Sequence, residues 1–154
     1  MAGEMSNTII EVWMRMYEEQ VRHARHHEAL RAQSTNVIVA ISAAVLAFFA
    51  SGHVSDARQY SVGVFLIIIN AYGLLMSMKH YERSRLHVTV GSQYRTALSA
   101  QTSLNGLEIN RARSVGRQAH ARTFRVTRAI RAYILWCGLH IMLGLTGLAI
   151  LVVK

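Results

Sequence analysis

Three stretches without a single Asp, Glu, Lys or Arg limit how this chain can fold: residues 32–55, 59–78 and 132–153. The hydrocarbon core of a bilayer is about 30 Å thick, and a helix crosses it with roughly 20 residues at about 1.5 Å each. Each stretch supplies that length, so the sequence predicts three transmembrane helices. A soluble bundle is the alternative, but three fully buried helices would need more amphipathic surface around them than 154 residues provide.

Residues 1–31 form a predicted amphipathic helix that leads into the first span. Apolar side chains recur every three or four positions from Met5 to Ala24. Two acid-first pairs four residues apart, Glu11 with Arg15 and Glu18 with Arg22, are spaced to stabilise an exposed helical face.

A group of titratable residues follows on the same segment. One helical face presents a carboxylate and imidazoles, which are ligands for transition metals: Glu19, His23, His26 and His27. A polar collar near the membrane surface explains these residues without special geometry. We therefore predict no metal site and no cofactor.

Residues 79–131 carry the charge of the protein. Of the 17 basic residues, eleven lie in this segment against only two acids, Glu82 and Glu108, which leaves the segment a net charge of +9, equal to that of the whole chain. We expect two helices joined by a turn at Asn105-Gly106, the second running from Leu107 to Arg131. The predicted fold is an all-α membrane protein with three transmembrane helices, and its long helical extensions form a basic helical hairpin.

The basic residues also predict the orientation. The N-terminal segment and residues 79–131 lie on the same side of a three-span topology and together hold fifteen of the 17 basic residues. By the positive-inside rule that side is cytoplasmic, so the N-terminus is in and Lys154 is out.

Such a concentration of cations implies an anionic partner. Lipid headgroups attract arginines close to the membrane, but Arg111 to Arg117 would stand some 20 to 30 Å above it, beyond a Debye length of about 8 Å. Nucleic acid or a nucleotide is the second candidate, since guanidinium groups fit phosphate bidentately; an acidic protein is the third. The expected ligand contacts are Arg111, Arg113, Arg117, Arg122, Arg125 and Arg128.

Polar residues inside the spans are further candidates. Asn36 near the start of the first span is a candidate pore residue, and Asn70 in the second is either a helix-to-helix contact or a pore-lining group. His140 in the third span is expected to be a hydrogen-bonded packing group rather than a proton relay.

The sequence has no Gly-rich phosphate loop, nucleophile elbow or paired-cysteine site, so we expect that the protein is not an enzyme. A protomer with three spans is too small to enclose a wide pore. A channel would therefore need a symmetric ring of copies, for which we expect a homo-oligomer, with a tetramer as the working assumption.

A family resemblance adds to this reading. The lead-in Arg25-His26-His27-Glu28-Ala29-Leu30-Arg31, the apolar hairpin 32–78 and the exit Lys79-His80-Tyr81-Glu82-Arg83-Ser84-Arg85 resemble small SLATT-type membrane effectors of bacterial antiphage defence. Those effectors have two spans; with a third, the chain looks most like the membrane effectors of the Hailong system. The resemblance implies an oligomeric ion channel in the bacterial inner membrane, controlled by single-stranded DNA oligomers from a partner nucleotidyltransferase.

The predicted function is thus an inner-membrane channel gated by a phosphate-rich ligand, acting in antiphage defence. The rival is a non-conducting membrane scaffold or adaptor that binds anionic lipid or an acidic partner protein.

Overall fold

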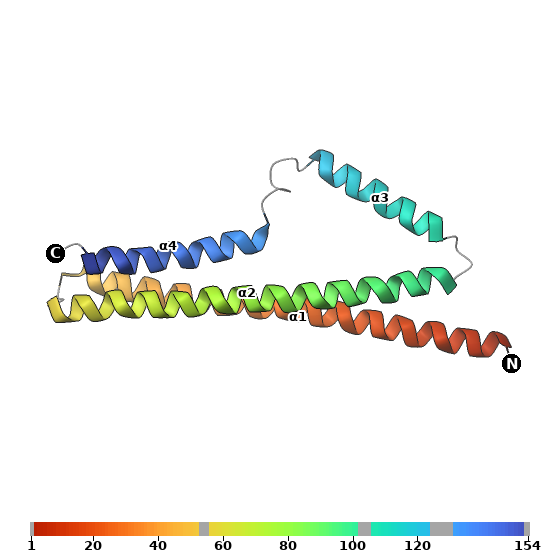
Figure 1. Cartoon of the computed structure of the whole chain (residues 1–154), viewed down its shortest axis with the longest axis horizontal. Helices are drawn as coiled ribbons and strands as arrows, with labels where there is room; N and C mark the ends of the chain where they lie inside the picture. Colours follow the sequence, from red (N-terminus) through yellow and green to blue (C-terminus); the bar gives the residue numbers. More distant parts are fainter. Residues whose placement is uncertain (1, 53–55, 102–105, 124–130, 153–154) are drawn as a thin grey trace. The chain divides into compact units, whose positions relative to one another are not determined.

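The computed structural model describes residues 2–52, 56–101, 106–123 and 131–152. All regular secondary structure in these residues is α-helical: α1 (Ala2–Ala50), α2 (Asp56–Gln101), α3 (Gly106–Thr123) and α4 (Ala132–Val152) (Figure 1). Three of them, α1, α2 and α4, are long and apolar enough to cross a membrane. The predicted fold class is confirmed at this level.

Helix boundaries agree with the predicted segments in part. The N-terminal helix and the first span form one helix, as expected, and so do the second span and the residues after it. However, α1 ends at Ala50, before the end of the expected segment 32–55, because Gly52 adopts a φ of 75° that ends the helix and starts the turn into α2. Of the helix expected from Leu107 to Arg131, the structure describes the part up to Thr123; residues 124–130 lie outside the described part, and Arg131 is not helical.

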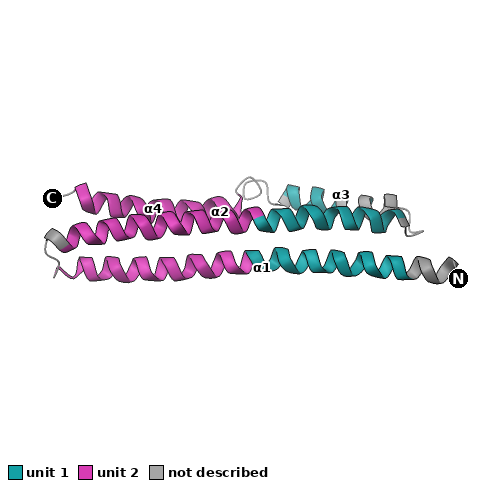
Figure 2. Ribbon diagram, turned by 60° about the horizontal axis from the view of Figure 1, so that its bottom comes forward, with its two compact units in different colours: residues 1–27, 83–130 teal, residues 28–82, 131–154 magenta. Residues whose placement is uncertain are grey.

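The chain divides into two compact units, which Figure 2 colours separately. Unit 1 consists of Met1–His27 and Arg83–Ile130, and unit 2 of Glu28–Glu82 and Arg131–Lys154. Helices α1 and α2 each contribute to both units.

The interior of unit 2 follows a seven-residue repeat. Buried positions on α1 are 31, 35, 38 and 42, and those on α2 are 63, 66, 70, 73 and 77. Alternating steps of three and four are the spacing of a left-handed coiled coil. Most of these positions hold glycine, serine, threonine or another polar residue, and the large buried hydrophobic side chains are Ile38, Leu66 and Ile150.

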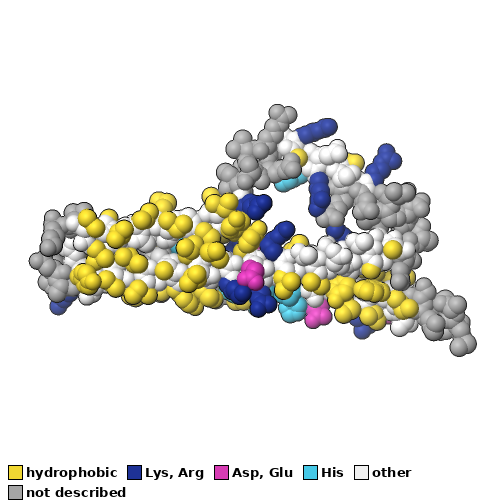
Figure 3. Space-filling model, viewed as in Figure 1, with side chains coloured by type: hydrophobic (Ala, Val, Ile, Leu, Met, Phe, Trp, Pro, Cys, Tyr) yellow, Lys and Arg dark blue, Asp and Glu magenta, His cyan; other side chains and the backbone are white. Residues whose placement is uncertain are grey.

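The surface of unit 2 is, in contrast, apolar. Hydrophobic side chains cover most of the visible face of α4 and of the part of α2 in this unit (Figure 3), and exposed examples include Phe48, Ile68 and Met142. A polar interior under an apolar surface is the reverse of a water-soluble bundle and is the arrangement that lipid favours. Unit 2 therefore has the character of a membrane domain.

The contact of α1 with α2 in unit 1 uses small and aromatic residues. Trp13 packs against Tyr94 with ring centroids 5.6 Å apart, and Ala24 and Ser84 are buried. At Gly91, an added Cβ would lie 3.3 Å from the Cβ of Gln20, so the absence of a side chain lets α1 approach closely.

Glycines also bring α2 and α4 together in unit 2. A Cβ built on Gly147 would lie 2.8 Å from the carbonyl oxygen of Gly63 and 2.9 Å from the Cβ of Leu66, both too close to be accommodated. Near the C-terminal end of α4, the side-chain amide of Gln59 donates to the carbonyl oxygen of Ile150 at 2.9 Å.

Gly147→Ala should therefore destabilise the protein by about 1–3 kcal/mol, as overpacking of a closely packed core does. Gly138→Ala on the same helix is the matched control, because its added Cβ meets no atom within 4 Å. The control should be neutral or slightly stabilising, since alanine favours helix. Thermal unfolding in detergent distinguishes the two, and equal melting temperatures would contradict the close contact.

Candidate functional site

A hydrogen-bonded network joins the three helices inside unit 2. The ring nitrogens of His140 lie 3.4 Å (Nε2) from Thr35 Oγ1 and 3.2 Å (Nδ1) from Asn70 Oδ1. The side-chain amide of Asn70 donates to Ser42 Oγ and to the carbonyl oxygen of Leu66, both at 3.0 Å. All four side chains of the network are almost completely buried.

The partners determine the tautomer of His140. An amide oxygen only accepts, so Nδ1 of His140 carries the hydrogen that it donates to Asn70. In the neutral ring Nε2 is then the acceptor, and the hydroxyl of Thr35 donates to it. His140 is also held by shape, because its ring fills the space where Gly73 has no side chain. Of the two alternatives for Asn70, a helix-to-helix contact or a pore-lining group, the network corresponds to the first. His140 is a hydrogen-bonded packing group, as we expected.

Asn36, the other candidate pore residue, lies on a different surface. It is exposed on a face of α1 within unit 2 that carries small or amide side chains at steps of three and four: Ala29, Gln33, Asn36, Ala40, Ala43 and Ala47. We call these six exposed residues the alanine face. Beside it, α1 exposes large apolar side chains at Val37, Ile41 and Phe48.

In unit 2, α1 thus has three faces of different chemistry. One contacts α2 and α4, one has the large apolar side chains that suit lipid, and the alanine face suits neither role. Asn36 lies about 6 Å inside the uncharged run that begins at residue 32. Moving an amide from water to hydrocarbon costs about 4–8 kcal/mol, so Asn36 requires water or a hydrogen-bonding neighbour.

The histidines of unit 1 form a stack instead of a metal site. His87 of α2 lies against two imidazoles of α1, with centroid distances of 5.1 Å to His23 and 5.5 Å to His27. Nδ1 of His87 donates to Oε1 of Gln20 at 2.8 Å, and His23 lies 3.5 Å from Glu19. Within the described residues no three His, Cys, Asp or Glu side chains could jointly hold a metal ion.

The six arginines expected to bind an anion are only partly described. Arg111, Arg117 and Arg122 are exposed on α3, and none of the three has an ion pair with a described residue. Arg113 lies in α3, but its side chain is outside the described part. Arg125 and Arg128 lie outside the described residues altogether.

Helix α3 divides its arginines between two faces. At about 100° per residue, Arg111 and Arg122 project within about 20° of each other, whereas Arg117 lies at least about 120° away from both. The apolar side chain of Val115 is also exposed on α3. A ligand lying along one face of a single α3 would therefore not contact Arg117 together with Arg111 and Arg122.

No protein-family model matches the chain, and no curated protein or solved structure matches it either.

The sequence did not predict that Thr35 and Ser42 are hydrogen-bond partners of His140 and Asn70, nor that the residues of the alanine face share one surface. The alanine face has a sequence signal, because positions 29, 36 and 43 and positions 33, 40 and 47 each recur every seven residues. The sequence signal for Thr35 and Ser42 is weaker. They also lie seven residues apart, but their hydrogen-bond partners are distant in sequence.

Asn70→Leu should destabilise the assembly of the three helices, since it removes the links to Ser42 and His140. Interhelical hydrogen bonds in membranes contribute about 0.6 kcal/mol each, with a maximum near 1.7. We expect a loss of about 1–3 kcal/mol, measured by unfolding in mixed detergent. The control is Thr146→Val, because exposed Thr146 donates only to Met142 of its own helix; a similar loss there would contradict a specific role for the network.

Proposed function

We propose that the chain is a subunit of a homo-oligomeric ion channel in the bacterial inner membrane, with its N-terminus and unit 1 in the cytoplasm. The channel is gated by a phosphate-rich ligand, a nucleotide or a single-stranded DNA oligomer, bound to arginines of α3. Such an activity fits an antiphage effector that depolarises the membrane, acting with a nucleotidyltransferase that supplies the ligand.

The observation that carries this proposal is the exposure of Asn36 on the alanine face. The interior of unit 2 is filled by the His140 network and by close glycine contacts, so a path for ions would run between copies. A ring of α1 helices with the alanine faces turned to the common axis would give Asn36 water or a neighbouring amide. Small side chains there leave room for a narrow polar path.

The arginines of α3 support the ligand. Arg111, Arg117 and Arg122 are exposed cations, and the described residues offer them no ion pair. Guanidinium groups favour phosphate because their planar donors match its oxygens. Two arginine faces on α3 also suit a ligand held between helices of neighbouring copies.

Asn36→Leu should lower the conductance of the purified protein in a planar bilayer, because it replaces a polar ring by an apolar constriction. We expect a fall on the order of tenfold, which corresponds to a barrier higher by about 1.4 kcal/mol. Asn36→Asp should shift the reversal potential toward cation selectivity. The matched control is Val37→Leu on the adjacent lipid-type face.

Two results would count against the channel. Conductance unchanged in Asn36→Leu would remove the alanine face from the pore. No current from the wild-type protein, with or without oligonucleotide, would favour the non-conducting scaffold.

Arg111→Glu with Arg122→Glu should weaken binding of a single-stranded DNA oligonucleotide to the detergent-solubilised protein. If both arginines contact phosphates, the slope of log affinity against log salt should become shallower by about 1.4, since each contact to a single strand contributes about 0.7. Arg83→Glu with Arg85→Glu, an equal charge change on exposed residues of α2, is the control. Equal losses in the two variants, or an unchanged slope, would show that these arginines do not bind phosphate specifically.

A further inference from the structure

The part of α1 in unit 1 carries charges of both signs on one face. Glu11, Arg15, Glu18 and Arg22 are exposed, and at about 100° per residue they project within an arc of about 60°. We call these four residues the charge ladder. The two acids lie along one edge of this arc and the two arginines along the other.

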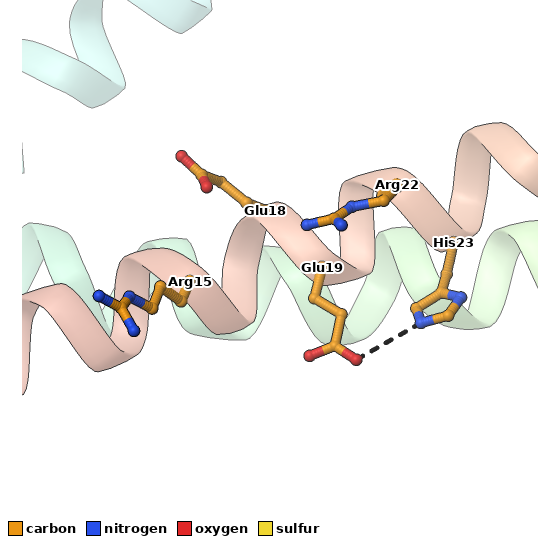
Figure 4. Close-up of a pocket in the computed structure, with 5 residues that line it drawn as sticks. All are labelled: Arg15, Glu18, Glu19, Arg22 and His23. Atoms are coloured by element: carbon orange, nitrogen blue, oxygen red, sulfur yellow. Dashed lines mark ion pairs between the residues drawn. The ribbon is translucent and has the colours of Figure 1, made fainter.

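No ion pair within the described residues neutralises these charges. The spacing allows Glu11 to pair with Arg15 and Glu18 with Arg22, yet neither pair forms in the part of the chain that the structure describes. Figure 4 shows Arg15, Glu18 and Arg22 projecting from α1, with an ion pair only between Glu19 and His23. The ladder can therefore meet a charged partner without first losing an internal one.

The remaining described surface of unit 1 is strongly basic. Its part of α2 exposes Arg83 and Arg85, and α3 exposes Arg111, Arg117 and Arg122. Residues 83–101 and 111–122 contain no Asp or Glu. Two copies that met through α2 or α3 would bring like charges together, which is unfavourable without a bound anion. The charge ladder carries as many acids as arginines, so a second copy can approach there.

A shared membrane would fix the direction of approach. Copies inserted with the same topology have parallel α1 helices, so the acidic edge of one ladder can face the arginine edge of the next. Such a contact is heterologous, and repeated rotation closes it into a ring. Alternating charges beside a helical seam set the register and partner choice in parallel coiled coils in the same way.

We infer that the charge ladder is an interface between copies of this chain, in which Glu11 and Glu18 of one copy pair with Arg15 and Arg22 of its neighbour. The occupant of this face is a second α1, not α3. Helix α3 offers arginines that would suit the two acids but would repel Arg15 and Arg22. This inference rests on the assembly in the proposed function and identifies the surface that orders it.

The test is a charge exchange between differently tagged copies of the full-length protein, co-expressed and captured from detergent. Variant one carries Arg15→Glu and Arg22→Glu, and variant two carries Glu11→Lys and Glu18→Lys. Each variant alone should capture its own kind about threefold to tenfold less than wild type at low salt, because exposed ion pairs are individually weak. Co-expression of the two variants should restore capture, since opposite edges then face each other.

A variant that misfolds would remain misfolded when the two variants are co-expressed. Restored capture in the mixture therefore cannot arise from misfolding. The matched control, Arg83→Glu with Arg85→Glu, changes the charge by the same amount as variant one and should capture itself as wild type does. The differences should disappear at about 0.5 M salt, where the Debye length falls to about 4–5 Å.

Normal self-capture by both variants, or no restoration in the mixture, would overturn the interface while leaving the channel proposal to its conductance test. Failure of wild-type copies to capture one another would overturn both, since the channel requires assembly. The two proposals can therefore fail separately.

Discussion

The structure depends on one constraint: a polar group surrounded by lipid must find its partner within the protein. Unit 2 meets it by placing its polar side chains inside, where Thr35, Ser42, Asn70 and His140 satisfy one another. Apolar contacts alone do little to fix how helices align in lipid, because lipid tails are as apolar as leucine. The network fixes this alignment, since its hydrogen bonds form in only one register of α1, α2 and α4.

Close packing follows from the same constraint. Dispersion forces act at short range, so helices in lipid gain from small residues at their crossings. Gly63 meets Gly147, and Gly73 meets the ring of His140. These contacts leave the protomer with a filled interior. Asn36 nevertheless lies exposed on the surface of unit 2, and this is why we propose that the alanine face serves assembly.

The sequence was sufficient to predict the three apolar helices and their continuity with the polar segments, because uncharged length and the absence of proline act locally. It was not sufficient for the partners of His140. Thr35 lies 105 residues away, and a hydroxyl in a helix can equally bond to its own backbone, as Thr146 does. The division of the α3 arginines between two faces follows from spacing alone and could have been predicted.

In the proposed assembly, the charge distribution determines which helix can lie nearest the axis. Residues 1–31 hold four arginines against five glutamates, whereas residues 79–131 carry a net charge of +9. Repulsion between copies grows as cations converge, so α1 is the helix that can gather at a centre and the arginines of α3 are better placed away from it. Helices α1 and α2 each run without a break through both units. In the proposed assembly, an anion that neutralises α3 would reduce the repulsion between copies in unit 1.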